Sequence, residues 1–196
     1  MNILLQSFAN LFLAISAPTT HFDSLNHLVR PDFELVDLYI ADDSLALVSM
    51  SDFLYYPFGR FENENKFIDK NSFFTSSCIL NIKDDDDSEY NIELTQFTHK
   101  SSTLFTINGE SGFLEIVKLN VIDQEIKFIN EIFVGMDKDT FFGKFFINSN
   151  TKKLCNIKKI VLVSGLQGIW HYYFFKNDHL DRIYIRTDYT VFEKLE

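Results

Sequence analysis

Acidic side chains form the densest group of potential ligands in the sequence, as a run of four aspartates at residues 84–87. A calcium-binding loop of the EF-hand type alternates its oxygen ligands, turns at a glycine in the sixth position and ends on a glutamate in the twelfth. This run has neither the alternation nor the glycine. Adjacent carboxylates repel one another and are best stabilised by water, so we interpret the segment as a solvated loop.

The histidines show no spacing that is typical of a metal or catalytic site. His21 and His27 are six positions apart, and no HExxH motif is present. His99 and His179 each stand in a turn segment, which predicts exposed side chains. The fifth histidine belongs to an aromatic segment that is considered below.

The cysteines and glycines also lack the arrangements that carry chemistry. Cys78 and Cys155 have apolar neighbours, which is typical of reduced core residues, although a disulfide between them is an alternative. No phosphate-binding glycine loop and no GxSxG motif occur. We therefore expect a protein that is not an enzyme and that uses no cofactor and no metal.

One of the densest aromatic runs is GIWHYYFFKNDHLDRIYI, residues 168–185, which contains the only tryptophan. Two apolar stretches separated by Asn177-Asp178 indicate a β-hairpin. A regular ladder that starts at this turn places Trp170, Tyr172 and Ile183 on one side. That side is mostly apolar, so we predict that it faces the core.

The opposite side of this hairpin pairs His171 with Tyr184, and Tyr173 with Arg182. Tyrosine and arginine dominate the residues that contribute most to protein interfaces, because they bury a large area and keep a polar end. An ordinary solvated sheet face, with arginine stacked on tyrosine, is the alternative. We predict a protein-binding face formed by His171, Tyr173, Arg182, Tyr184 and Arg186.

Size and charge bound the class of protein and of partner. The chain has 196 residues, of which 46% are hydrophobic and 23% charged, a balance that indicates a folded protein. Its net charge is −10, and residues 1–98 carry 16 acidic and 5 basic side chains, whereas residues 99–196 carry 12 and 13. The acidic front half disfavours nucleic acid. It suits a basic protein partner, although solubility alone is the alternative explanation.

The first residues allow two interpretations that place the protein in different compartments. Apolar residues at spacings of three and four within residues 1–17 predict an amphipathic helix that ends at Pro18, in a cytoplasmic protein. Small residues near Ala14 and Ser16 are typical of a signal-peptide cleavage site, which would make the protein periplasmic or secreted. The stretch is too short and too polar to cross a membrane.

The remaining chain indicates short helices and many strands. A second helix is predicted over residues 21–33, another from about Glu62, and a third is capped by Asp137 and carries four phenylalanines. Strands are predicted at residues 33–40, 44–50, 77–82, 89–97, 101–107, 112–121, 125–134, 158–165, 168–175 and 180–187.

Two glycine turns indicate an internal repeat. Gly59 and Gly135 lie 76 positions apart, and each precedes a short helix and antiparallel strands. We therefore predict an α+β fold with short N-terminal helices and antiparallel sheets. The chain forms a single unit, 1–196, with half-repeats near residues 50–121 and 125–196.

Gly135-Met136-Asp137-Lys138 leads into a predicted helix, and Trp170 and Tyr172 lie on one of the three predicted strands that follow. On these residues, the segment 130–186 resembles the small outer-membrane-assembly lipoproteins of the SmpA/OmlA family. That family has a Gly-Met-Ser/Thr-Lys turn that enters a helix, followed by a three-stranded antiparallel sheet with a Trp-x-Tyr strand. The matching positions here are Gly135, Met136, Lys138, Trp170 and Tyr172. Asp137 replaces the hydroxyl residue, the Leu-Gly-x-Pro that follows the helix is missing, and there is no lipobox cysteine.

This resemblance and a second one, to NTF2-like proteins, imply two different functions. The related β-lactamase inhibitor protein fold is a tandem of such units whose concave sheet face binds a protein, which implies a non-catalytic, inhibitory or immunity-type binding protein. The opening LFLAISAPTTHFDSLNHLVRPDFELVD and the closing FFKNDHLDRIYI are similar to NTF2-like proteins. That likeness implies, as the alternative, a cone with extra strands that binds a small molecule or is an enzyme. A cell-envelope protein is the third alternative.

Overall fold

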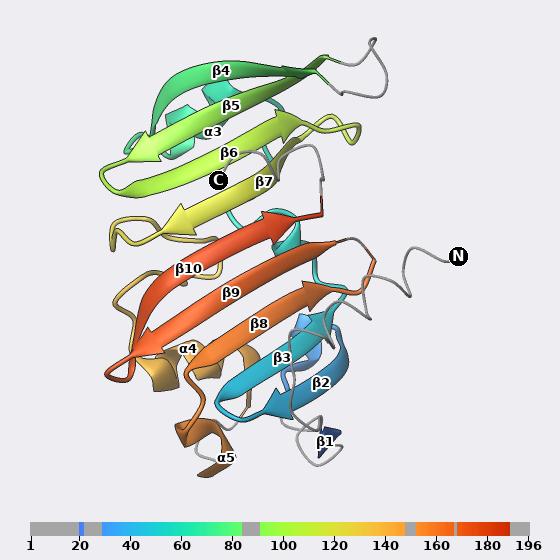
Figure 1. Cartoon of the computed structure of the whole chain (residues 1–196), viewed down its shortest axis with the longest axis vertical. Helices are drawn as coiled ribbons and strands as arrows, with labels where there is room; N and C mark the ends of the chain where they lie inside the picture. The colour runs from blue at the N-terminus through green and yellow to red at the C-terminus, as the bar shows by residue number, and fades with distance from the viewer. Residues whose placement is uncertain (1–19, 22–28, 84–90, 148–151, 167, 189–196) are drawn as a thin grey trace.

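The computed structural model describes residues 20–21, 29–83, 91–147, 152–166 and 168–188. In this part of the chain, ten strands form one sheet in the order β1-β2-β3-β8-β9-β10-β7-β6-β5-β4 (Figure 1). Neighbouring strands are antiparallel, apart from β3 and β8, which are parallel. The protein therefore has the predicted α+β fold with a mostly antiparallel sheet.

The bounds of the described elements follow the chain. The strands are Thr20–His21 (β1), Leu35–Ala41 (β2), Ser44–Ser49 (β3), Thr75–Lys83 (β4), Asn91–His99 (β5), Ser102–Asn108 (β6), Leu114–Val121 (β7), Lys159–Ser164 (β8), Ile169–Lys176 (β9) and His179–Thr187 (β10). The helical segments are Pro31–Phe33 (η1), Asp52–Leu54 (η2), Glu64–Lys70 (α3), Lys138–Phe145 (α4) and Lys152–Cys155 (α5).

Helices α3 and α4 lie behind the sheet in Figure 1 and cover one of its faces. We call the other face, which neither of these helices covers, the open face. Phe67 of α3 packs on Phe97 of β5 with ring centroids 4.9 Å apart, and Phe141 of α4 packs on Tyr173 of β9 at 4.8 Å. Both helices therefore bury their apolar sides on the same face, and the main core lies between helices and sheet.

Aromatic rings fill much of this core. The chain contains 22 phenylalanines, and many belong to one buried cluster that spans both helices. Phe58, for example, meets Phe67, Phe74 and Phe128 edge to face at 5.7, 6.0 and 5.1 Å. Such edge-to-face pairs are the preferred packing of aromatic rings, so the high phenylalanine content is accounted for largely by the interior.

Most predicted strands are confirmed, but the segment at residues 125–134 is not a strand. It forms a tight turn in which Phe128 N donates to the Ile132 carbonyl at 2.9 Å, and Glu131 N donates to the Phe128 carbonyl at 2.9 Å. Glu131 has a φ of +61°, which a strand residue does not adopt. The only ladder contact of this segment in the described chain is an isolated bridge between Lys127 and Phe133.

The predicted helix within residues 21–33, which Pro31 was expected to stop, is not formed at its described positions: Val29 makes an isolated bridge with Phe146. His21 belongs to β1 and pairs with Tyr39 of β2, whereas Pro31–Phe33 forms the 3-10 turn η1. Residues 22–28 lie outside the described chain. So do the predicted helix at residues 1–17, the acidic run 84–87 and the side chain of Cys78.

The two predicted glycine turns share one backbone feature. Gly59 has a φ of +98° and Gly135 a φ of +96°. The first precedes α3 and the strands β4 to β7, and the second precedes α4 and the strands β8 to β10. The half-repeat itself stays a prediction. Among the described helices, none is both long enough and apolar enough to span a membrane.

Candidate functional site

A β-bulge in the terminal hairpin decides which side chains of β9 face solvent. The β9–β10 ladder pairs Leu180 with Phe175, as predicted, but then pairs Arg182 with Phe174. Asp181 is the extra residue, opposite no partner of its own. Beyond the bulge every pair is shifted by one position, so β9 presents the opposite set of side chains to the core from the predicted one.

The predicted exposure of His171 and Tyr173 is therefore wrong. Both side chains are 0% exposed and point to the face that the helices cover. Tyr173 lies opposite Ile183, and His171 lies opposite Ile185. Neither side chain can reach a partner protein while the core is intact.

His171 and Tyr173 instead form a buried polar pair. The Nε2–H of His171 donates to the Leu54 carbonyl at 2.9 Å, because a carbonyl oxygen can only accept. Nδ1 is then the acceptor for the Tyr173 hydroxyl at 3.2 Å. Burial lowers the pKa of His171 to about 4, partly opposed by the Leu54 hydrogen bond, and burial raises the pKa of Tyr173. The imidazole is thus neutral and structural.

The open face of the sheet carries the other side chains of this hairpin. Arg182 and Arg186 are exposed and Tyr184 is partly exposed, on the side where they were predicted. Trp170 and Tyr172 were predicted on the core side, and the bulge turns them to this face instead; Trp170 is nevertheless buried there, at 9% exposed, whereas Tyr172 is partly exposed. We call Trp170, Tyr172, Arg182, Tyr184 and Arg186 the aromatic–cationic strip; its role in binding stays a prediction.

Rings and guanidinium groups contact one another along the aromatic–cationic strip. The guanidinium carbon of Arg186 lies 5.1 Å from the Trp170 ring centroid and 5.8 Å from that of Tyr172. That of Arg182 lies 5.5 Å from the Tyr184 centroid, and the Tyr172 and Tyr184 rings are 5.9 Å apart. These distances are those of cation–π contacts, which hold each guanidinium beside a ring.

Two residues of β7 extend the strip, and the sequence did not indicate them. Asn120 accepts a hydrogen bond from Nε of Arg182 at 2.6 Å, and Lys118 lies directly opposite Arg186. Only the pairing of β7 with β10, two strands far apart in the chain, brings these residues together. Burial raises the pKa of Tyr172, and the positive charge of Arg186 partly opposes that shift.

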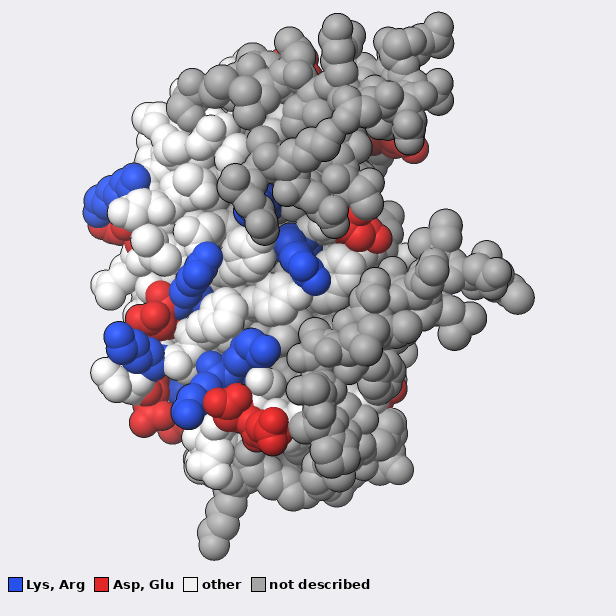
Figure 2. Space-filling view, in the orientation of Figure 1, with Lys and Arg blue, Asp and Glu red and all other residues white. Residues whose placement is uncertain are grey.

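A small apolar cluster lies on this side of the sheet beyond Trp170, and its members are buried, between 1% and 9% exposed. It consists of Trp170 with Ala46 and Val48 of β3 and with Val161 and Val163 of β8. Figure 2, which views this face, shows several lysine and arginine side chains among uncharged surface, with acidic groups beside some of them. The accessible part of this face therefore combines the partly exposed rings of Tyr172 and Tyr184 with exposed cations.

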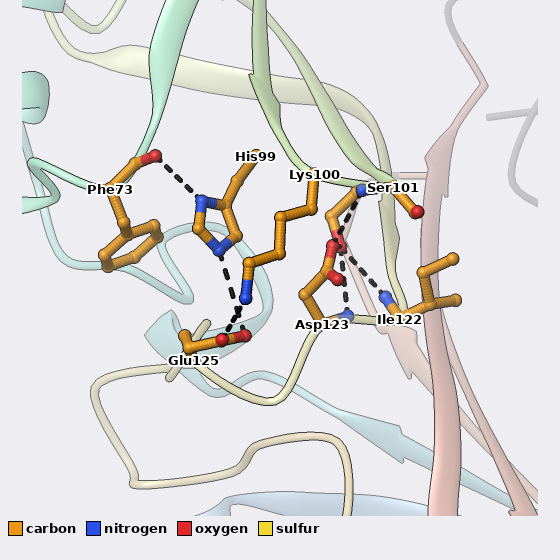
Figure 3. Close-up of polar contacts among 8 residues, drawn as sticks. Phe73, His99, Lys100, Ser101, Ile122, Asp123 and Glu125 are labelled. Carbon is orange, nitrogen blue, oxygen red and sulfur yellow. Dashed lines mark hydrogen bonds and ion pairs between the residues drawn. The ribbon is translucent and has the colours of Figure 1, made fainter.

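A second polar cluster lies where the β5–β6 turn meets the segment after β7 (Figure 3). His99 is only 15% exposed, so its predicted exposure is wrong, whereas His179 is exposed as predicted. Nδ1–H of His99 donates to the Phe73 carbonyl at 2.9 Å, and Nε2 lies 3.8 Å from a carboxylate oxygen of Glu125. Lys100 donates to the other oxygen of Glu125.

The neighbouring serines complete this cluster as a structural tie. Asp123 accepts hydrogen bonds from Ser101 N at 3.1 Å and from Ser102 Oγ at 2.6 Å. Ser102 Oγ in turn accepts from Ile122 N at 3.0 Å. These bonds hold a turn that contains Lys100 at a φ of +48°. These contacts hold the backbone of the β5–β6 turn against the segment after β7 (Figure 3).

A hollow of about 390 Å³ lies at the start of α4. Lys138, whose side chain is largely buried, lines this hollow. Its ammonium group donates a hydrogen bond to the Cys155 carbonyl at 2.6 Å and lies 3.8 Å from a carboxylate oxygen of Asp178. The lining residues are Asp137, Lys138, Asp139, Phe142, Leu154, Cys155, Asp178 and His179. Within the described chain, no three His, Cys, Asp or Glu side chains are placed to hold a metal ion.

No family model matches the chain, and no curated protein or solved structure is significantly similar to it. The likenesses to SmpA/OmlA proteins, to the β-lactamase inhibitor protein and to NTF2-like proteins stay predictions. The function must therefore be argued from the surface itself.

Proposed function

We propose that the protein is a non-catalytic binding protein of the inhibitory or immunity type, which docks a partner protein on the aromatic–cationic strip. The observation that carries the proposal is the position of these rings on the open face, on the side of the sheet away from both helices. This face gathers Tyr and Arg, which are among the residues that dominate interface energetics.

The contacts within the strip favour binding for a second reason. Arg186 lies beside two rings, and Arg182 is held by both Tyr184 and Asn120. Ordering a long side chain on association costs roughly 0.5–1.5 kcal/mol. Part of that cost is already met in the free protein, because neighbours on three strands restrain both arginines.

A photo-crosslinker tests the proposal. We would place p-benzoylphenylalanine at Tyr184, and as the control at Lys66, an exposed residue of α3 on the helix-covered side. In cells of the source organism we expect one discrete adduct from position 184 and none from position 66.

Competition separates a specific adduct from chance proximity. Excess unlabelled wild-type protein should abolish the adduct, whereas excess Tyr172→Ser/Tyr184→Ser protein should not. Identical adducts from both positions, or an adduct that the double variant removes as well as wild type does, would refute docking on the strip.

A further inference from the structure

Lys118, Arg182 and Arg186 gather positive charge on the strip and beside it. Lys118 of β7 and Arg186 of β10 lie directly opposite each other, and Arg182 lies on the same face of β10. Like charges directly opposite in a ladder destabilise a sheet. In the described chain, no ion pair is formed by any of these three residues.

This arrangement stands out because the protein is rich in carboxylates. The net charge is −10, and acidic side chains pair with cations elsewhere, as Glu62 does with Lys66 and Asp43 with Lys158. A charge arrangement that costs stability in the free protein and stays unpaired is accounted for by an anion that arrives from outside.

The geometry suits a carboxylate as that anion. Of the donors of Arg182, Nε bonds to Asn120 at 2.6 Å, which leaves its terminal N–H groups directed elsewhere. A planar guanidinium that is restrained by rings presents paired N–H groups, which bind a carboxylate in bidentate fashion. The rings beside it supply apolar contact for the methylene groups of an aspartate or glutamate.

We infer that the strip binds the acidic surface of its partner protein, through carboxylates received by Lys118, Arg182 and Arg186. This inference rests on the proposed function and sharpens it. A basic partner, suggested by the acidic front half, would be repelled from this face. A nucleic acid extends past three cations, and its phosphates would meet the net negative charge of the rest of the protein.

A charged peptide probes the inference directly. We would titrate the wild-type protein into fluorescein-labelled poly-glutamate and follow fluorescence anisotropy at low ionic strength. The test variant is Lys118→Gln/Arg186→Gln, and the matched control is Lys66→Gln/Lys158→Gln, which removes the same charge from exposed sites away from the strip.

The expected result is about tenfold weaker peptide binding for the test variant and less than about a twofold change for the control. Added salt should weaken binding by the wild type, because exposed charges are screened within about 10 Å at 0.1 M. Equal weakening in both double variants would overturn the inference. So would tighter binding of poly-lysine than poly-glutamate, or equal binding of a labelled single-stranded oligonucleotide.

The crosslinked partner separates this inference from the function on which it rests. If that partner bound Lys118→Gln/Arg186→Gln as tightly as wild type but lost affinity for Tyr172→Ser/Tyr184→Ser, docking on the strip would stand and the acidic contact would fall. If neither double variant changed its affinity, both proposals would fall.

Discussion

The hydroxyl of Tyr173 lies 3.2 Å from Nδ1 of His171, in the interior between the sheet and α4. The histidine is satisfied on both nitrogens, because its Nε2–H reaches the Leu54 carbonyl across the layer. This three-group chain joins β9 to the turn η2, and it requires a neutral imidazole. Charge on that ring would be buried without a counter-charge.

Stability should therefore fall on acidification through His171. The pKa of its imidazole is lowered from 6.5 to about 4. Between these two pH values the unfolded chain binds a proton at this ring, whereas the folded chain does not. The neutral His171 ring makes its full contribution to the free energy of unfolding above pH 6.5. This contribution, about 3 kcal/mol in total, is lost as the pH falls toward 4. Urea unfolding between pH 7.5 and 4 measures this loss.

Imidazole NMR isolates the residue responsible for this pH dependence. The His171 ring signals should stay those of the neutral form down to about pH 4. A His171 ring that became protonated near pH 6.5 in the folded protein would contradict the buried hydrogen-bond chain.

Truncation of Tyr173 should unfold the protein far more readily than truncation of Tyr184. Tyr173→Ala removes a fully buried ring and should cost about 3–5 kcal/mol in the free energy of unfolding. Tyr173→Phe keeps the ring and leaves His171 Nδ1 unsatisfied, for about 1–3 kcal/mol. Tyr184→Ala on the open face should cost less than about 1 kcal/mol. Similar losses for both alanine variants would disprove the face assignment.

Deletion of Asp181 should be tolerated, whereas deletion of Ile183 should not. Asp181 is the extra residue of the bulge, so its removal restores a regular ladder and keeps every side chain on its present face. Removal of Ile183 exchanges the faces of the rest of β10 and exposes Ile185. Circular dichroism and thermal unfolding distinguish the two, and loss of the fold in the Asp181 deletion would show that the bulge itself is required.

Two glycines should respond to alanine with opposite signs. Gly135 has a φ of +96°, and an added Cβ would lie 2.9 Å from the Gln124 side chain, so Gly135→Ala should destabilise by about 1–3 kcal/mol. Gly143 lies inside α4 with open space around its Cα, so Gly143→Ala should stabilise by about 0.5–1 kcal/mol. A shift in the same direction for both, in denaturant unfolding, would contradict this assignment.

Local features were predictable because neighbouring residues carry them. The turn between β2 and β3, the loop between β6 and β7, and the side-chain cap that Asp137 provides to Thr140 each depend on a few adjacent residues. Alternation also placed Ile183 in the core correctly. In the two turns and the helix cap, the hydrogen-bond partners are close in sequence, so the local residues alone indicate them.

The bulge was missed because β9 has rings on both of its faces, and either register buries aromatic surface. One signal was present. Leu180, Ile183 and Ile185 are all buried, and the odd spacing between Leu180 and Ile183 breaks the alternation of a regular strand. No feature of the local sequence indicated that Lys118 and Asn120 lie beside the strip. Only the long-range pairing of β7 with β10 places them next to Arg182 and Arg186.

The parallel pairing of β3 with β8 has a consequence for the growing chain on the ribosome. Leu45 of β3 lies beside Ile160 of β8, so the apolar hairpin β2–β3 is synthesised long before its neighbour exists. At usual rates of translation this delay is on the order of ten seconds. During that interval the edge of β3 is unpaired, which exposes this hairpin of the nascent protein to mispairing and aggregation.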